Sequence, residues 1–209
     1  GDRTFLEEDI LYLDGTSLDV HVAAGSFFTQ DEDIDALYVD DQGDIYFSTA
    51  GSATIAAGID GGAGGMQSGD IILYRPLTGS FHRYIADAGP NVDAFGIWGG
   101  TPYLSLSTDD VVGANQLAVS DDPVFTLSGT DLAAGVVAKV IDSHQLLLGI
   151  SAPGITVTDI DAFSMTAAGE MLFSTTGSYS FLREGGNPNN TRDYVTRDGG
   201  VVYRFDPAS

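Results

Sequence analysis

The sequence predicts an all-β protein built of antiparallel four-stranded units, on three observations. Only 5 of its 30 acidic residues are Glu and only 1 of its 8 basic residues is Lys, so the residues that favour exposed helices are scarce. Asp and the 27 Gly, which favour turns, are abundant. Apolar residues alternate with a period of two, and short blocks of sequence recur along the chain.

The first strand of each unit begins with a block that occurs three times. The blocks DIDAL, NVDAF and DIDAF start at residues 33, 91 and 159. Their central acids are Asp35, Asp93 and Asp161, and apolar residues continue in alternation after each block. We therefore expect these three acids at equivalent strand starts.

A second strand follows a turn in each unit. Residues 40–43 (DDQG) predict a tight turn, because Asp and Gly favour the required backbone conformations. The runs after the turns end in Ser-Thr at residues 48–49, 107–108 and 174–175, and aligning these pairs matches the three strands. Both faces of these strands are mildly apolar, so we expect both faces to be covered.

Two further strands complete the unit. The third is expected at 69–75, 134–140 and 199–205, and the fourth at 80–86 and 143–149. Similar segments near the start form a half unit. The chain is thus predicted to be a single repeat domain with a half unit at 5–25 and units at 31–89, 90–150 and 155–206.

With its Asp-Ile/Val-Asp-Ala blocks, Gly turns and apolar-Ser-Thr strands, the sequence resembles the repeat segments of secreted bacterial β-propeller-like proteins. The resemblance implies a propeller-like arrangement, as an incomplete or a closed ring, and an exported protein located outside the cell or in the periplasm. A β-sandwich or β-prism made of the same repeats is the alternative fold.

Composition excludes several classes of function. The formal net charge of −22 disfavours nucleic acid and anionic membranes as partners. No apolar run reaches the roughly 18 residues of a membrane span, so no membrane insertion is expected. The absence of Cys excludes thiol catalysis and Cys-ligated zinc.

The first block carries the candidate metal ligands Asp31, Asp33 and Asp35. Carboxylate oxygens suit Ca²⁺, which is the one cofactor expected here. Alternate residues on a pleated strand lie roughly 7 Å apart, which is too far for one ion unless the backbone curls. The recurrence of Asp35, Asp93 and Asp161 once per unit favours a structural role, in which the Asp accepts backbone hydrogen bonds at the start of the strand. The run 61–66 (GGAGGM) begins like a calcium-binding nonapeptide but has Met66 where Asp is needed, and is expected to be a flexible surface loop.

The candidate ligand-binding residues lie in long inserts between the second and third strands, at 50–68, 109–130 and 176–198. Variable loops on a repeated scaffold commonly carry binding, here of a protein or a glycan. The last insert combines aromatic and basic residues, and Trp98 is a further platform for a sugar ring. The predicted ligand-binding set is Trp98, Tyr179, Arg183, Arg192, Tyr194 and Arg197.

No catalytic residue is predicted. The sequence has no G-x-S-x-G elbow, and its three His are isolated from one another. We therefore expect a non-catalytic, exported structural or protein-interaction module. The alternatives are a propeller-type glycoside hydrolase or lyase that uses carboxylates, and a carbohydrate-binding module.

Overall fold

The computed structural model describes residues 9–13, 18–30, 32–86, 90–119, 124–141, 160–166, 171–175, 179–182, 194–197 and 203–205. The regular elements of these residues are strands and one short 3-10 turn, and the named strands pair only in antiparallel fashion. None of them belongs to a helix long and apolar enough to cross a membrane. The prediction of an all-β antiparallel protein is confirmed.

The elements, in chain order, are β1 (Ile10–Leu13), β2 (Leu18–Val22), η1 (Ala24–Ser26), β3 (Ile34–Val39), β4 (Ile45–Thr49), β5 (Ala53–Thr54), β6 (Gly65–Met66), β7 (Ile71–Arg75), β8 (Ser80–Ile85), β9 (Val92–Trp98), β10 (Thr101–Leu106), β11 (Asp110–Val112), β12 (Leu117–Val119), β13 (Val124–Ser128), β14 (Val136–Ile141), β15 (Ile160–Met165), β16 (Met171–Thr175), β17 (Tyr179–Leu182), β18 (Tyr194–Arg197) and β19 (Tyr203–Phe205).

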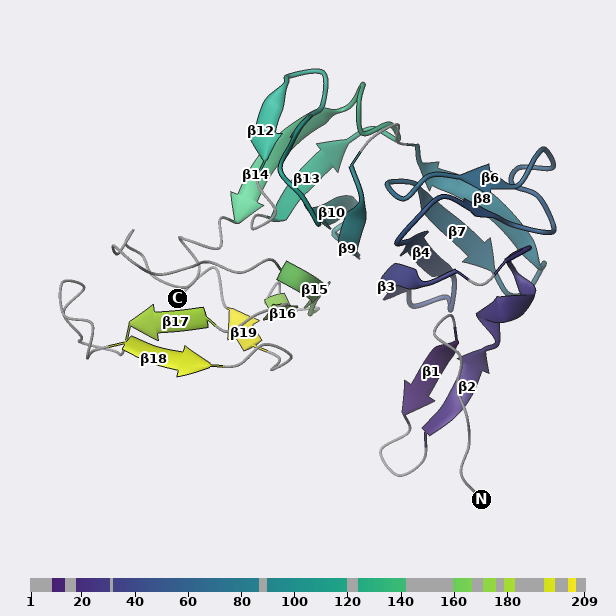
Figure 1. Cartoon of the computed structure of the whole chain (residues 1–209), viewed down its shortest axis with the longest axis horizontal. Coiled ribbons are helices and arrows are strands. Elements are labelled where there is room, and N and C mark those ends of the chain that lie inside the picture. The colour runs from purple at the N-terminus through teal and green to yellow at the C-terminus, as the bar shows by residue number, and fades with distance from the viewer. Residues whose placement is uncertain are drawn as a thin grey trace.

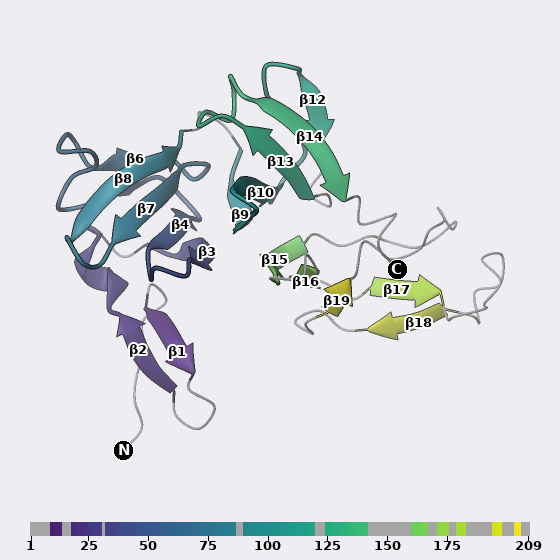
Figure 2. The same cartoon turned by 180° about the vertical axis from the view of Figure 1, so that it is seen from behind.

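Three larger sheets are arranged along an arc (Figure 1). The first has the order β3-β4-β7-β8 and the second β9-β10-β13-β14, so each runs in chain order from one edge to the other. The third has the order β15-β16-β19. Strand β9 contacts both β3 and β15. The view from behind shows the same open arc, and the described strands do not close into a ring (Figure 2).

Strand β4 is buried along its whole length because both faces of the first sheet are covered. On one face, Ile45 and Phe47 pack with Phe27 and Phe28, which precede β3. On the other face, Tyr46 joins the core that the first sheet shares with the second. The expectation that this strand is covered on both faces is confirmed.

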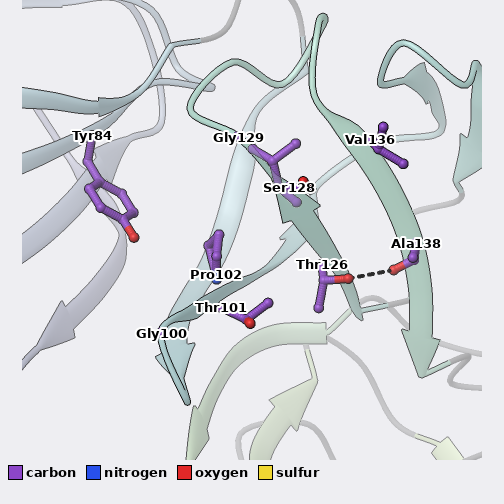
Figure 3. Close-up of a pocket in the computed structure, with 10 residues that line it drawn as sticks. Tyr84, Gly100, Thr101, Pro102, Thr126, Ser128, Gly129, Val136 and Ala138 are labelled. Carbon is purple, nitrogen blue, oxygen red and sulfur yellow. Dashed lines mark hydrogen bonds between the residues drawn. The ribbon is translucent and has the colours of Figure 1, made fainter.

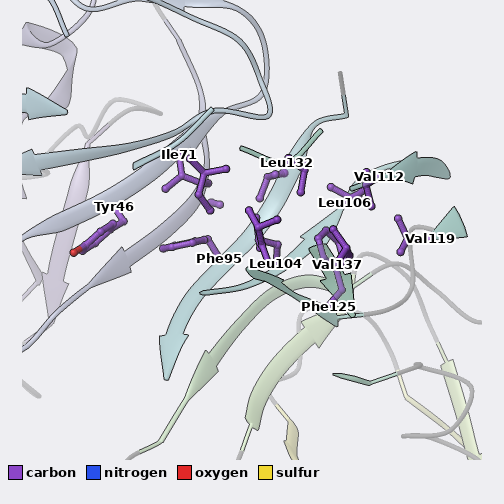
Figure 4. Packing of buried hydrophobic residues seen from close by; sticks show 14 of the residues in the cluster. Tyr46, Ile71, Phe95, Leu104, Leu106, Val112, Val119, Phe125, Leu132 and Val137 are labelled. Atoms are coloured by element: carbon purple, nitrogen blue, oxygen red, sulfur yellow. The ribbon is translucent and has the colours of Figure 1, made fainter. Parts of the chain in front are cut away.

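Neighbouring sheets share their hydrophobic cores (Figure 4). One cluster combines Tyr46 and Ile71 of the first sheet with Phe95, Leu104 and Phe125 of the second. Burial of these apolar side chains stabilises the two sheets together. A separate cluster joins the second and third sheets in the same way. Its members are Ala94, Tyr103, Val124, Ile160, Phe163, Met171 and Phe173.

The first strand of each larger sheet has an irregular register near its start. In β3, β9 and β15 the pairing with the next strand shifts within the first four residues. Asp35, Asp93 and Asp161 are each the second residue of the strand and lie at this shift. Such β-bulges bend a strand and increase its twist locally. The three acids therefore occupy corresponding places, at the inner edge of their sheets.

The alignment of the second strands on Ser107 is wrong by two residues. Ser105 is the residue that pairs opposite Ala94 in β9, as Ser174 pairs opposite Ala162 in β15. A shift of two residues leaves every side chain on its original face of the sheet. The alternation of apolar residues could therefore not reveal the error.

The third and fourth strands of the second sheet also differ from the prediction. The third strand is β13, inside the range 109–130 that was expected to be an insert. The segment 134–140, expected to be the third strand, instead contributes the fourth strand, β14. The segment 143–149 lies outside the described residues.

Short hairpins separate the second and third strands in all three larger sheets. They are β5–β6, β11–β12 and β17–β18. In the first, Met66 is only 2% exposed and packs into the core of the first sheet. The expectation of a flexible surface loop over 61–66 is therefore wrong at its end, because the apolar Met66 side chain is buried.

Candidate functional site

Two buried serines connect neighbouring sheets on the inside of the arc. Ser48 Oγ accepts a hydrogen bond from Ala36 N at 2.9 Å and donates to Val92 O at 2.7 Å. Ser105 Oγ lies 2.6 Å from Asp93 Oδ1 and 3.2 Å from Ile160 O, the two acceptors within reach of its proton. The carbonyls contacted are those of the first residues of β9 and β15. The polar groups here serve to join strands.

Asp35 is the candidate metal ligand that the structure describes best. Asn91 Nδ2 donates a hydrogen bond to Asp35 Oδ2 at 2.6 Å. Burial raises the pKa of Asp35, the bond from Asn91 partly opposes this, and the charges of Asp33 and Asp161 raise it further. Carboxylates on the inside of the arc therefore repel one another.

The calcium site at Asp31, Asp33 and Asp35 stays a prediction. Asp31 lies outside the described residues. Among the residues that are described, no group of three or more His, Asp or Glu is arranged to hold a metal ion. The observed hydrogen bond of Asp35 comes from the side-chain amide of Asn91, whereas a backbone N–H was expected as its donor.

A cleft of about 420 Å³ opens beside the second sheet (Figure 3). Strands β10 and β13 pair at Tyr103 with Thr126 and at Leu104 with Phe125. The cleft lies next to these paired residues, with residues of β10, β13 and β14 on one side and Tyr84 of the first sheet on the other (Figure 3). It is lined by Tyr84, Gly100, Thr101, Pro102, Thr126, Leu127, Ser128, Gly129, Val136 and Ala138.

The lining carries hydroxyl groups and no charge. Hydroxyls come from Tyr84, Thr101, Thr126 and Ser128. Thr126 Oγ1 donates to Ala138 O at 3.3 Å, a long bond that leaves the oxygen's lone pairs available. The Tyr84 hydroxyl is protonated at neutral pH, because the ordinary pKa of a tyrosine is 10.0 and burial raises it further, so it can donate a hydrogen bond. The cleft can therefore both donate and accept hydrogen bonds.

Trp98 lies next to this cleft. It ends β9 and is the cross-strand partner of Thr101, a lining residue, across the turn formed by Gly99 and Gly100. Both glycines have positive φ, of 58° and 79°, which permits the tight turn. The indole is 41% exposed, and its ring centroid lies 6.4 Å from that of Tyr103. An exposed aromatic ring thus stands beside a hydroxyl-lined hollow.

The predicted residues of the 176–198 insert fall partly on the hairpin β17–β18. Tyr179 is the Cα partner of Arg197, and Tyr194 is the partner of Leu182. Arg183 and Arg192 lie outside the described residues. The structure therefore brings Tyr179 and Arg197 together along the backbone, while the binding role of the set stays a prediction.

The predicted binding insert 109–130 includes four of the ten residues that line the cleft, and Trp98, a predicted ligand-binding residue, lies beside it. The other six lining residues were not predicted. Thr126 and Ser128 belong to β13, which was assigned to an insert. The alternation of Phe125, Thr126, Leu127 and Ser128 was the available signal, since buried apolar residues alternate there with more exposed hydroxyls. Tyr84 comes from another sheet, and no local pattern predicts that contact.

Neither a family model nor a curated protein matches this sequence. Among solved structures, the chain is similar to the extracellular domain of a putative one component system from B. thetaiotaomicron, with 11% sequence identity and a TM-score of 0.36. The match covers 92% of this chain and 19% of that one, so the chain spans about a fifth of its length. A likeness this weak indicates nothing about function.

Proposed function

We propose that the protein is an exported interaction module made of propeller-like antiparallel units, and that it binds a neutral carbohydrate in the cleft between Tyr84 and β13. The observation that carries the proposal is the uncharged, hydroxyl-lined hollow beside the exposed indole of Trp98. The repeated strand order and the corresponding places of Asp35, Asp93 and Asp161 support propeller-like units.

The chemistry of the lining matches that of a sugar. A pyranose presents hydroxyls at its edge, which hydrogen-bond to side chains such as Thr101, Thr126 and Ser128. Its less polar C–H face packs on an aromatic ring, the role proposed for Trp98. A volume of about 420 Å³ is within the range of small-molecule sites, which is about 300–1,000 Å³.

Charge decides which carbohydrate fits. The protein has a net charge of −22, while the cleft lining contains no basic residue. An anionic sugar would approach a negative surface and find no cation in the lining to pair with it. A neutral oligosaccharide is therefore the preferred ligand over a uronic acid or a sulfated sugar.

A protein partner held by the 176–198 insert is the second candidate. Tyr179 and Arg197 are cross-strand partners there, and aromatic and Arg residues are typical of interface centres. A glycoside hydrolase using paired carboxylates is less well supported, because no carboxylate lines the cleft. Asp35 instead accepts a hydrogen bond from Asn91, the residue before β9, and Asp93 is bonded to Ser105 of β10.

A glycan array followed by calorimetric titration tests the proposal. We expect binding of neutral oligosaccharides and none of uronic-acid or sulfated ones. Thr126→Val keeps the side-chain shape but removes the hydroxyl, and should weaken binding by about 3- to 10-fold, the value of one hydrogen bond. Trp98→Ala should weaken binding similarly, whereas Trp98→Phe should restore much of it.

The matched control is Thr54→Val, at an exposed position of β5 away from the lining. It should leave affinity unchanged. If no neutral glycan binds, or if the double variant of Trp98 and Thr126 binds as tightly as the parent protein, the cleft is not a carbohydrate site.

A further inference from the structure

Three side chains on the outer edge of the first sheet form a continuous hydrogen-bonded chain. Ser80 Oγ lies 3.1 Å from His82 Nε2, and His82 Nδ1 lies 2.9 Å from Asp60 Oδ1. Ser80 and His82 are two residues apart on β8, so they share one face of the strand. Asp60 comes from the loop between β5 and β6.

The order of groups sets the direction of the protons. An ionised carboxylate only accepts hydrogen bonds, so Nδ1 of His82 carries the proton that points at Asp60. In the neutral imidazole, Nε2 then has a free lone pair and accepts the hydroxyl proton of Ser80. Thr78 Oγ1 lies 2.7 Å from Ser80 Oγ, and either hydroxyl can donate that bond; Thr78 Oγ1 also lies 3.4 Å from Arg75 O, a second acceptor for its proton. This is the arrangement in which a His acts as general base toward a Ser.

Asp60 is held firmly in place. Its φ of 53° is unusual for a residue other than Gly, and its N–H donates to Phe81 O at 3.0 Å. Its second oxygen, Oδ2, accepts from Arg83 N at 3.2 Å. The hydrogen bond from the Arg83 backbone N–H lowers the pKa of Asp60 most, and the bond with His82 lowers it further. The carboxylate thus stays ionised and oriented toward His82.

Ser80 is half-buried, with more open surroundings on the side of the preceding turn and of its hydrogen-bonding partners. It follows Gly79, whose φ is 65° and where a Cβ would meet no heavy atom within 4 Å. The side chains of His82 and Asp60 are 37% and 56% exposed. Arg75 is the cross-strand partner of Ser80, and its guanidinium forms an ion pair with Asp44, with Nε 3.3 Å from Oδ2.

We infer that Ser80 is a nucleophile toward carboxylic esters, with His82 as its general base and Asp60 as the positioning residue for the imidazole. Ser80 Oγ attacks the ester carbonyl while its proton passes to His82 Nε2. The C–O bond to the alcohol then breaks, and the alcohol leaves with that proton. Water, deprotonated by the same imidazole, hydrolyses the acyl-serine to release the acid and free Ser80.

The inference goes beyond the proposed binding function. Tyr84, which lines the cleft, continues the alternation of Ser80 and His82 along β8, at roughly 7 Å per two residues. An acylated carbohydrate seated in the cleft could therefore extend toward Ser80. Esterolysis is nevertheless measured separately from glycan binding, so either proposal can fail without the other.

A purely structural role is the competing explanation. Asp60 donates its backbone N–H to Phe81 O and accepts from Arg83 N, so it satisfies backbone groups on the edge strand β8. Such contacts protect the edge of a sheet from pairing with another chain. In that case Ser80 would have the reactivity of an ordinary serine, and His82 would not influence it.

A fluorophosphonate probe, which labels activated serines, separates the two explanations. The full chain is incubated with the probe, and the labelled peptide is identified by mass spectrometry. We expect labelling at Ser80, complete loss in Ser80→Ala, and a rate reduced by about 10²-fold or more in His82→Gln, the usual contribution of a general base.

Asp60→Asn separates the carboxylate's charge from its backbone role, because Asn tolerates a positive φ and keeps an acceptor for Arg83 N–H. It should lower the rate by less than His82→Gln does while leaving the melting temperature nearly unchanged. Ser52→Ala, at an exposed serine on another loop, is the matched control and should label as the parent protein does. Equal labelling of the parent and His82→Gln, or no labelling at Ser80, would overturn the inference.

Discussion

At the scale of single residues, Ser48 and Ser105 perform a corresponding task in two sheets. Each reaches from the second strand of its own sheet to the carbonyl of the first residue in the next sheet's first strand. Both serines are fully buried. Because a buried backbone group without a partner is costly, these bonds specify how one sheet sits against the next.

Replacing Ser48 with Ala tests this role. The change removes the partner of both Ala36 N–H and Val92 C=O in a buried place. We expect Ser48→Ala to lower the free energy of unfolding by about 2 kcal/mol, measured by urea denaturation. Ser52→Ala, where the lost bond to Gln67 Oε1 is exposed, should cost much less. Equal effects of the two variants would contradict the account.

Asp35 destabilises the folded protein at neutral pH, because burial raises its pKa above the ordinary value of 3.8. The folded state binds a proton more readily than the unfolded state, so stability is lost as the pH rises through the raised pKa. Asp35→Asn, which can still accept from Asn91, should therefore raise the melting temperature at pH 7. The gain should vanish below pH 3.8, where both states are protonated.

Asp41→Asn is the control for this change, since it removes the same charge from the exposed turn between β3 and β4. It separates the effect of burial from that of net charge. A lower melting temperature for Asp35→Asn at pH 7 would contradict this prediction. It would show that the carboxylate stabilises the folded protein, which is the effect expected if it bound a cation.

At the scale of elements, the hairpin β5–β6 requires glycine at position 64, because there is no room for a side chain there. A Cβ on Gly64 would lie 1.9 Å from Ile55 O, and Gly64 O accepts from Ile55 N at 2.8 Å. We expect Gly64→Ala to lower the free energy of unfolding by about 2 kcal/mol, because backbone must move to relieve the clash. In Gly51→Ala a Cβ would meet nothing within 4 Å, so that variant should be nearly neutral in the same denaturation experiment.

Elements whose signals are local were predicted correctly. The turn at residues 40–43 is present, with Gly43 at φ 81° and Asp40 Oδ1 accepting from Gln42 N and Asp44 N. The strands after the acidic blocks are present because apolar alternation and turn residues agree there.

Contacts between distant segments could not be predicted in the same way. Because residues 134–140 resemble the other third strands, they were assigned as the third strand of the second sheet, although that strand is β13. The cleft depends on where β10 and β13 stop pairing, and the chain Ser80–His82–Asp60 depends on a loop returning to a strand edge. Each of these arises from tertiary pairing, which no single stretch of sequence encodes.

At the scale of the whole molecule, the net charge of −22 opposes folding through repulsion between carboxylates. Raising NaCl from a few millimolar to about 0.15 M shortens the Debye length to about 8 Å and screens this repulsion. We expect the melting temperature to rise over this range. A melting temperature that falls with salt would indicate that ion pairs, such as Arg75 with Asp44, outweigh the repulsion.

The same melt, repeated with Ca²⁺ and then with chelator, tests the predicted ion at Asp31, Asp33 and Asp35. A cation bound only to the folded state must raise the melting temperature by mass action. The matching addition of Mg²⁺ controls for screening by a divalent ion. An unchanged melting temperature after chelation would remove calcium from the account.

The central claim is that the sheets form one array, because neighbours share cores and are joined through Ser48 and Ser105. The proposed cleft needs this, since Tyr84 and Thr126 come from different sheets. Differential scanning calorimetry tests it most directly. The account predicts one transition, with calorimetric and van't Hoff enthalpies equal, that moves as a whole in Ser48→Ala. Two or more separate transitions, with only one displaced by that substitution, would contradict it.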